Sequence, residues 1–318
     1  MVARARTIRQ RDRLVPVWEK TDFVMSERAR YDSIFRDDLF KGQTIVVTGG
    51  GSGIGRCTAH ELARLGAQVI VTGRNRDKLE AVAEEITGDG GKCATSAFDI
   101  RDEAAVQEAV AALIAAHGPI HGLVNNAGGQ FPAELKDISL KGWQAVLATN
   151  LTGGFLVMRE VFKASMQETG GAIVNMTADM HNGMPGMGHS GAARAGMSNL
   201  TMTAAYEWAR YGIRVNAVAP GWIASSGMDT YGGAVKAMIP YLRQHLPAKR
   251  LGSEAEVSAA IVFLLSPAAS FITGITLPID GGAPLGNSAF PLEDHDRFDV
   301  WNGFHRAVEP DVLRGEGG

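Results

Sequence analysis

The sequence has little of what defines several protein classes. Only two cysteines occur among 318 residues, Cys57 and Cys93, and neither stands in a Cys-x-x-Cys or Cys/His spacing. A disulfide framework is therefore excluded, and no metal site is expected. No run of 18 apolar residues is present, so no membrane-spanning helix is expected. The net charge of −3, without basic residues interleaved with aromatics, argues against nucleic-acid binding.

The two ends of the chain carry no clear sorting signal. Five arginines stand in the first 15 residues without the apolar core of a secretory signal, and Asp12, Glu19 and Asp22 soon dilute the positive charge. The sequence ends on Arg-Gly-Glu-Gly-Gly, which is not a peroxisomal Ser-Lys-Leu address. We therefore expect a cytoplasmic protein whose Arg-rich start is an oligomer arm or a leader, with a transit peptide as the alternative.

From residue 43 onward, short apolar or β-branched runs alternate with helical patterns. The expected strands are residues 43–48, 68–71, 92–98, 122–125, 172–176, 213–218 and 275–277. The expected helices are a first one ending at residue 65, then 77–86, 102–117, 140–168, 189–211 and 253–265. Right-handed crossovers between parallel strands lay their helices on both faces of the sheet.

This alternation predicts an α/β fold. We expect a single doubly wound, Rossmann-type domain with a mainly parallel seven-stranded sheet and helices on both faces. It would span residues 41–285, because no low-complexity linker or internal repeat interrupts them. Residues 1–40 form an N-terminal extension and residues 286–318 a C-terminal tail, both expected to wrap on the surface or on a partner subunit.

The turn between the first strand and the first helix is rich in glycine and reads Thr48-Gly-Gly-Gly-Ser-Gly-Ile-Gly55. Glycine lets the backbone turn sharply and approach a pyrophosphate, and the helix N-terminus offers unpaired N–H donors with a partial positive charge. The candidate cofactor contacts in this turn are Gly49, Gly51, Ser52, Gly53, Ile54 and Gly55. A bound dinucleotide is therefore expected.

Two arginines follow the second strand, where an acidic residue would bind the adenosine ribose hydroxyls of NAD(H). The guanidinium groups of Arg74 and Arg76 suit a 2′-phosphate instead, so NADP(H) is favoured over NAD(H). The alternative, a solvated turn residue, holds for Arg76 more than for Arg74. After the third strand, Asp99 either accepts from the adenine amine or acts as a cap beside Asp102.

Five motifs in order resemble the short-chain dehydrogenase/reductase family over roughly residues 40–285. They are Thr48–Gly55, Asn125-Asn-Ala-Gly128, Asn150, Pro220-Gly221 and Asp280-Gly-Gly282. Within the family, residues 126–131, 141–143, 189–196, 246–250, 266–274 and 294–296 look most like the branch of peroxisomal trans-2-enoyl-CoA reductases. The resemblance implies NADPH, acyl-CoA substrates and reduction of a carbon–carbon double bond.

The resemblance also implies which residues touch the cofactor. Ser52 and Ile54 would contact the phosphates. The other implied contacts are Asp99 and Ile100 at the adenine; Asn126, Ala127 and Gly128 at the ribose and fourth strand; Pro220, Gly221 and Ile223 at the nicotinamide; Ser225 at its amide or the pyrophosphate; and also Thr177 and Arg194.

The sequence departs from the family where carbonyl-reducing members carry a Ser, a Tyr and a Lys. These positions hold Ala178, Ser190 and Arg194, whereas the Asn of the tetrad remains as Asn150. Carbonyl reduction places a proton on oxygen and needs an acid of suitable pKa, which a serine alone does not provide. Reduction of an enoyl thioester instead develops charge on an oxygen that hydrogen-bond donors can stabilise.

The candidate catalytic residues follow from this departure. Ser190 and Arg194 stand four apart and share one helix face. We expect Arg194 to bind the nicotinamide ribose hydroxyls and Ser190 to donate toward the thioester oxygen, while His189, His181 or a water protonates Cα. Ser190 as a small packing residue and His189 as a helix cap are the alternatives.

Two other functions remain open. The protein is a carbonyl/alcohol oxidoreductase whose proton donor comes from elsewhere, for example Tyr231 or His189, or it is a catalytically silent NADP(H)-binding member. In every case the partner is a small-molecule substrate, an acyl-CoA thioester or a ketone or alcohol. The resemblance further implies a homotetramer or homodimer, formed through the helices at residues 140–168 and 189–211.

Overall fold

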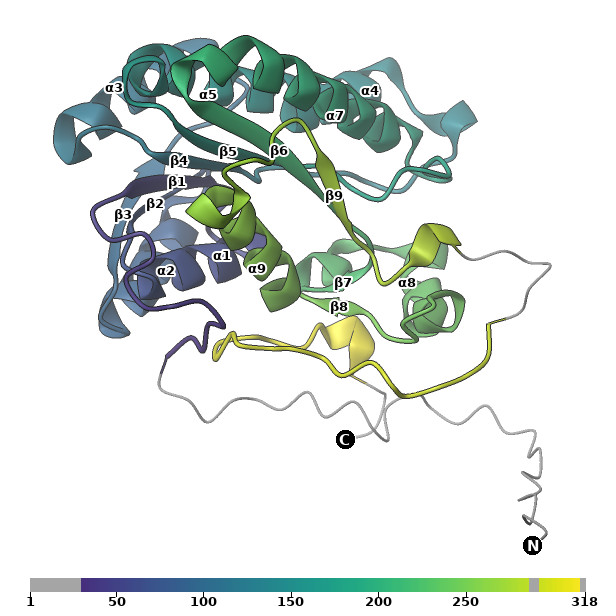
Figure 1. Ribbon diagram of the computed structural model, residues 1–318. Coiled ribbons are helices and arrows are strands. Elements are labelled where there is room, and N and C mark those ends of the chain that lie inside the picture. Colours follow the sequence, from purple (N-terminus) through teal and green to yellow (C-terminus); the bar gives the residue numbers. More distant parts are fainter. Residues whose placement is uncertain (1–29, 286–291, 315–318) are drawn as a thin grey trace, which may run out of the picture.

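The computed structural model describes residues 30–285 and 292–314, which build a parallel sheet between two layers of helices (Figure 1). The strand order is β3-β2-β1-β4-β5-β6-β9, and every pair is parallel. The strands are β1 Thr44–Thr48, β2 Gln68–Gly73, β3 Lys92–Ala97, β4 Gly122–Asn125, β5 Gly171–Met176, β6 Ile213–Pro220 and β9 Thr276–Ile279. The predicted doubly wound α/β fold with seven strands is confirmed.

Two hydrophobic cores hold the helices against the sheet, one on each face. Alternate residues of a strand point to opposite faces, so Val47 packs into one core and Val46 into the other. The first core includes α1 (Gly53–Arg64), α2 (Arg76–Gly88) and α9 (Glu254–Leu265). The second core includes α3 (Glu103–His117), α5 (Gly153–Val161) and α7 (Gly188–Trp208). Figure 1 shows the two helical layers.

The segment expected as one helix over residues 140–168 is interrupted twice. It consists of α4 (Leu140–Leu147), α5 and α6 (Gln167–Thr169), joined by π-helical turns at Ala148–Thr152 and Phe162–Met166. A π turn adds a residue to the helical repeat and often marks a functional position. Here the first one carries Asn150, which is buried.

Short elements that the periodicity did not reveal lie beyond the sheet's carboxyl edge. β7 (Ile223–Ala224) pairs with β8 (Gly252–Ser253), and α8 (Gly233–Met238) lies between them in sequence. Strands of two residues have no periodicity to detect. Short 3-10 turns occupy Leu135–Asp137, Ala209–Tyr211, Ser226–Thr230, Ile239–His245, Pro267–Ala269, Ala283–Leu285 and Asp311–Leu313.

The described parts of the two extensions pack together on α1 and α9. Tyr31 and Phe304 are buried in one cluster with Cys57 and Ala255, and the N–H of Asp32 donates to the main-chain oxygen of Gly303. The expectations for the Arg-rich start and for the extreme end of the tail fall on residues 1–29, 286–291 and 315–318, outside the described residues. Within the described ranges, no helix is both long and apolar enough to cross a bilayer.

Candidate active site

The glycine turn connects β1 to α1 with its backbone closely packed against β4. A Cβ on Gly55 would overlap the main-chain oxygen of Gly49 and lie 2.5 Å from Nδ2 of Asn126. Gly49 and Gly53 adopt positive φ angles of 67° and 57°, which favour glycine. Backbone packing and backbone conformation therefore both require glycine in this turn.

The α1 N-terminus leaves its donors available to a ligand. Its N-cap, Ser52, makes no side-chain capping bond, and no acidic residue lies in the first turn of the helix. The first N–H groups of a helix have no partner inside it, and together with the helix dipole they bind anions well. The sharp turn, the absence of side chains and these donors fit a pyrophosphate.

Asn126 and Thr48 fix this turn to the next strand. Asn126 Nδ2 donates to the main-chain oxygen of Thr48 at 2.9 Å, and the N–H groups of Asn126 and Ala127 donate to Thr48 Oγ1 at 3.0 and 2.9 Å. The side chain of Asn126 and both N–H groups are thus used to hold the turn, which leaves the main-chain oxygens of Asn126 and Ala127 for any contact with ribose.

The end of β2 presents one arginine with no ion pair among the described residues. Arg74 is exposed there, whereas Arg76 lies 3.7 Å from Glu80 on its own helix. Asp99 is held by Arg101 through three side-chain hydrogen bonds, and this pairing, with the nearby Arg74, lowers the pKa of Asp99. Arg74 is therefore the side chain that remains available for a 2′-phosphate.

Arg194 lies beneath the exposed backbone of Gly128. Its side chain is 8% exposed, and its Nη1 donates to the main-chain oxygen of Met176 at 2.5 Å. A Cβ on Gly128 would stand 2.6 Å from Nη2 of Arg194 and 3.0 Å from Oδ1 of Asn150, so the guanidinium fits only below a glycine. Burial lowers the pKa of Arg194 to about 10, while Tyr231 acts to raise it.

Asn150 ties the loop after β4 to the helix layer. Its Oδ1 accepts from the N–H of Gly129 at 2.8 Å, and its Nδ2 donates to the oxygen of the same residue at 2.9 Å. Both polar atoms of the amide are used, so Asn150 shapes the loop from Gly128 to Gln130. The π turn is what brings Asn150 into this position.

Ser190 does not present a free hydroxyl. Ser190 is fully buried, and its Oγ donates to Oε1 of Gln130 at 2.6 Å. Nε2 of Gln130 in turn donates to the phenol oxygen of Tyr231 at 2.8 Å. Gln130 was not predicted as a functional residue, because no spacing rule connects a loop residue with partners 60 and 101 positions away.

His189 is fully buried beside Ser190. Its Nδ1 accepts from the N–H of Ser190 at 3.0 Å, although the N-cap of α7 is Met187 and not His189, and its ring contacts Phe131 edge-on with centroids 4.5 Å apart. Nε2 of His189 has no partner among the described residues.

Of the remaining expected cofactor residues, Thr177, Pro220, Gly221, Ile223 and Ser225 lie at or beyond the carboxyl ends of β5 and β6, whereas Ile100 follows β3. Thr177 uses both its N–H and its Oγ1 to bind the oxygen of Val218 at 2.8 Å, and Ile100 is a core residue in contact with Gly153. A Cβ on Gly221 would approach Cα of Asp280 to 2.8 Å. Pro220 ends β6, Ile223 lies in β7, and the side chain of Ser225 makes no capping bond.

Comparison with known proteins identifies the family. The family described as Enoyl-(Acyl carrier protein) reductase matches residues 49–284. A probable 2,4-dienoyl-CoA reductase of Bacillus subtilis is 37% identical over 252 residues, which cover 78% of this chain and 99% of the relative. The chain belongs to the short-chain dehydrogenase/reductase family. It is accordingly an oxidoreductase that uses a nicotinamide cofactor on a small-molecule substrate.

Other members of the family differ in the reactions their names describe. A gluconate 5-dehydrogenase of Gluconobacter oxydans is 37% identical over 248 residues, covering 77% of this chain and 96% of the relative. The solved structure of the citronellol catabolism dehydrogenase AtuB of Pseudomonas aeruginosa PAO1 is 63% identical, with a TM-score of 0.73, and covers 80% of this chain and 99% of that chain.

In this short-chain dehydrogenase/reductase, one further acid lies close to the glycine turn. A Cβ on Gly53 would be 3.8 Å from Oε1 of Glu254, the first residue of α9. Burial raises the pKa of Glu254 to about 7, against the opposing charge of Arg56. Sequence gave no sign of this proximity, because 201 positions separate the two residues.

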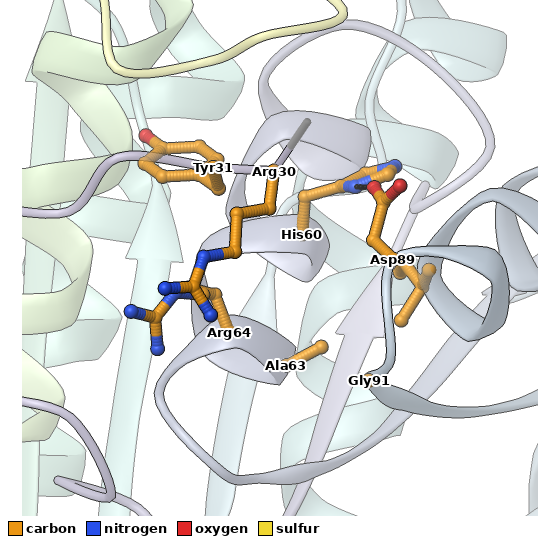
Figure 2. Close-up of a pocket in the computed structure, with 8 residues that line it drawn as sticks. Arg30, Tyr31, His60, Ala63, Arg64, Asp89 and Gly91 are labelled. Carbon is orange, nitrogen blue, oxygen red and sulfur yellow. Dashed lines mark ion pairs between the residues drawn. The ribbon is translucent and has the colours of Figure 1, made fainter. Parts of the chain in front are cut away.

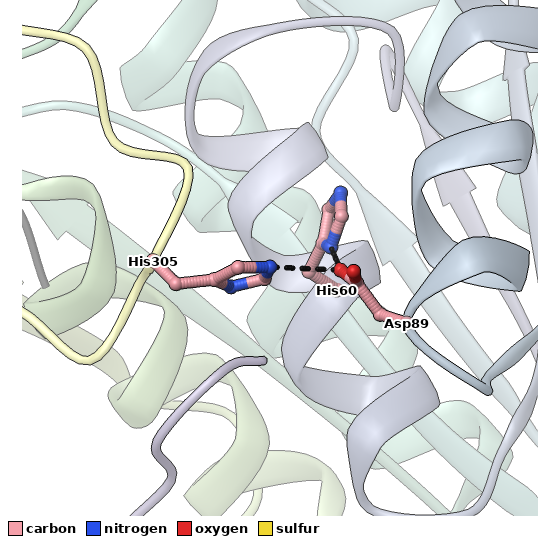
Figure 3. A group of neighbouring side chains, drawn as sticks. All are labelled: His60, Asp89 and His305. Carbon is pink, nitrogen blue, oxygen red and sulfur yellow. Dashed lines mark hydrogen bonds and ion pairs between the residues drawn. The ribbon is translucent and has the colours of Figure 1, made fainter. Parts of the chain in front are cut away.

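A second polar cluster lies on the other half of α1, away from the glycine turn. A small pocket there is lined by residues of α1, the segment before β1 and the turn after α2 (Figure 2). Beside it, His60, Asp89 and His305 bring their ligand atoms within 4.8 Å of one another (Figure 3). No metal site was expected from the sequence, and this group of side chains was not predicted.

The charges around this cluster are already balanced. Arg306 makes two hydrogen bonds to Asp89, at 2.7 and 3.2 Å, and Arg56 makes two to Glu85, at 2.8 Å each. Burial lowers the pKa of both His60 and His305, so both imidazoles are neutral at pH 7. A divalent cation would bring two further positive charges beside the guanidinium groups. We therefore interpret the cluster as a set of contacts that attach the C-terminal tail, through His305 and Arg306, to Asp89.

Proposed function

We propose that this protein is an NADP(H)-dependent reductase of the carbon–carbon double bond in a 2-enoyl thioester. The observation that carries the proposal is Ser190 at the family's Tyr position while Arg194 keeps a cation at the Lys position. A buried guanidinium without a carboxylate partner stabilises negative charge that develops nearby. A thioester enolate develops such charge without requiring a full proton on its oxygen.

Arg74 is exposed and makes no ion pair within residues 30–285 and 292–314, which supports NADP(H) as the cofactor. The glycine turn and the α1 N-terminus would hold the pyrophosphate, and Arg194 would hold the nicotinamide ribose. When bound, the reduced nicotinamide supplies the hydride. The residues of the chain orient the substrate beside it and stabilise the charge that results.

The relatives suggest the substrate class. The Bacillus subtilis relative is named for dienoyl-CoA reduction, and AtuB is named for catabolism of citronellol, a branched terpenoid alcohol. We infer that the acyl chain of the thioester is a branched isoprenoid chain. The second candidate function is oxidation of such an alcohol or reduction of its carbonyl, which the name of AtuB and the gluconate 5-dehydrogenase relative favour.

Cofactor oxidation with matched substrates tests the proposal. Purified protein is mixed with NADPH and crotonyl-CoA, a longer trans-2-enoyl-CoA or geranoyl-CoA, and absorbance of the reduced nicotinamide is followed. We expect consumption, fastest with the branched chain. Turnover of citronellol with NADP⁺ and none of the thioesters selects the second candidate. Tight NADPH binding with no turnover of either class indicates a silent member and overturns both.

We also propose a homo-oligomer formed through α5 and α7, as the resemblance implies. Phe155 on α5 is 36% exposed, and Met202 and Tyr206 on α7 are 52% and 88% exposed. Large apolar side chains gathered on neighbouring helices are typical of subunit contacts. Light scattering on the purified protein gives the mass directly, and a monomer would contradict this assignment.

A further inference from the structure

We propose that Tyr231 is the proton donor of this active site, provided by the segment after β7 instead of by α7. The inference rests on the proposed function for its enoyl substrate, and it holds equally for the carbonyl substrate of the second candidate. It accounts for the missing Tyr at position 190 by placing a phenol from another element beside the same cation.

Gln130 fixes the direction of the hydrogen bonds around the phenol. Its Oε1 accepts from Ser190 Oγ at 2.6 Å, so its Nε2 faces Tyr231 and donates to the phenol oxygen at 2.8 Å. An amide nitrogen only donates. The phenol of Tyr231 is therefore an acceptor toward Gln130, and its own O–H remains free to donate to a substrate. Ser190 acts as a positioning residue in this arrangement.

Arg194 provides the charge that a proton donor of this kind needs. The guanidinium is buried and makes no ion pair with any of the described residues, and the phenol of Tyr231 is near enough to raise the pKa of Arg194 against the effect of burial. The cation would stabilise negative charge that develops nearby while the proton is transferred. Lys fulfils this role toward Tyr elsewhere in the family, as the resemblance implies.

The C-terminal tail holds the segment that carries Tyr231. Tyr231 packs against a buried cluster that includes Met228 and Leu313, and the N–H of Val312 donates to Oδ1 of Asp229 at 2.9 Å. Asp229 is the acidic residue nearest to Tyr231 in sequence, and its carboxylate is directed toward the C-terminal tail. The aromatic ring is partly buried, so packing restricts its position while water reaches it for reprotonation.

Tyr231 transfers its proton after hydride has been added to the substrate. Once hydride has added to Cβ, the electron pair of the double bond lies on the enolate. The O–H bond of Tyr231 breaks, its proton forms the new C–H bond at Cα, and the enolate electrons form that bond as the thioester carbonyl returns. The phenolate stays opposite Arg194 and takes a proton from water. With a carbonyl substrate, the same proton goes to the alkoxide oxygen.

Tyr231→Phe removes the donor and keeps the ring. We expect kcat to fall by about 100-fold or more, in the range of general-acid catalysis, with the Kd for NADPH unchanged by fluorescence titration. In deuterated water the parent enzyme should place deuterium on one face of Cα, and Tyr231→Phe should lose this face selectivity. Tyr241→Phe is the matched control, because Tyr241 is 48% exposed, and it should behave as the parent.

A measurement without cofactor tests the arrangement itself. In protein labelled at tyrosine Cζ, the resonance that Tyr231→Phe removes should shift in both Ser190→Ala and Arg194→Gln, whereas the other tyrosine resonances stay in place. A resonance that moves in neither variant overturns the hydrogen-bond path and the contact with Arg194.

The outcomes separate this inference from the proposed function. Full activity in Tyr231→Phe with enoyl thioesters overturns Tyr231 as the proton donor and leaves the proposed function intact. A loss of activity confined to His189→Asn assigns the proton to the imidazole of His189 instead. Activity with citronellol or its aldehyde alone, lost in Tyr231→Phe, overturns the enoyl substrate and supports the donor. A parent enzyme that turns over neither class overturns both.

Discussion

Arg194 donates a hydrogen bond from Nη1 to the main-chain oxygen of Met176 at 2.5 Å, so the guanidinium is tied to the end of β5. It lies directly below Gly128, where a Cβ would stand 2.6 Å from Nη2. The cation is thus held between two strand ends, at the edge where ligands bind in doubly wound folds.

Two substitutions of Arg194 distinguish the effect of its positive charge from the effect of its shape. Arg194→Ala leaves the oxygen of Met176 without its donor and removes the cation, so we expect the Kd for NADPH to rise by roughly 10- to 100-fold, the size of a charge-assisted hydrogen bond. Arg194→Lys keeps the charge and should recover most of the affinity. Fluorescence titration measures both, and an unchanged Kd in Arg194→Ala would show that the guanidinium does not face the cofactor.

We expect cofactor choice to depend on Arg74, which makes no ion pair with the described residues. In Arg74→Gln the preference for NADPH over NADH should fall by roughly 10- to 100-fold, because a 2′-phosphate loses a charged donor. Arg76→Gln is the control, since Arg76 already lies 3.7 Å from Glu80. The ratio of kcat/KM for the two cofactors is the measurement. A larger effect at Arg76 than at Arg74 would reverse the assignment.

Local sequence patterns were sufficient to predict the order of strands and helices. Alternating strands and helices, and a glycine turn after the first strand, predicted the sheet and its seven strands. The single helix expected over residues 140–168 is three, because π turns at Ala148–Thr152 and Phe162–Met166 interrupt it, and a π turn leaves the apolar periodicity almost unchanged.

Contacts between distant segments were not predictable in this way. The path from Ser190 through Gln130 to Tyr231 joins three separate elements, and Phe304 of the tail is buried against α1 although its neighbours are polar. Such contacts form only when distant segments pack together, so no local sequence pattern encodes them. Ser190 was expected to donate toward the substrate, but its hydroxyl is directed to Gln130.

The glycine turn permits a sharp test with a control on the next helix. Gly55→Ala would overlap the main-chain oxygen of Gly49, so we expect a loss of about 1–3 kcal/mol in the free energy of unfolding and loss of measurable NADPH binding. Gly88→Ala, at the end of α2, meets nothing within 4 Å and should gain about 0.5–1 kcal/mol. Denaturant unfolding and fluorescence titration measure both. Unchanged binding in Gly55→Ala would contradict the pyrophosphate site.

We expect Glu254 to make cofactor binding depend on pH. Burial raises its pKa to about 7 from the ordinary 4.5, so the carboxyl beside Gly53 is neutral in mild acid and ionised above neutrality. A raised carboxyl pKa favours the folded state at low pH, and this contribution is lost as pH rises through about 7. Ionisation also places a negative charge near the phosphates, so the Kd for NADPH should increase between about pH 6 and about pH 8.

Glu254→Gln removes this titration. NADPH binding should then be tighter than in the parent at about pH 8 and equal to it at about pH 6, and the fall in unfolding free energy from acid to neutral pH should be smaller. The 2′-phosphate of the cofactor titrates identically in both proteins, so the difference between them isolates Glu254. Glu84→Gln, on the exposed side of α2, is the control and should follow the parent. A Glu254→Gln profile that parallels the parent at every pH would mean that this carboxyl does not sense the phosphates.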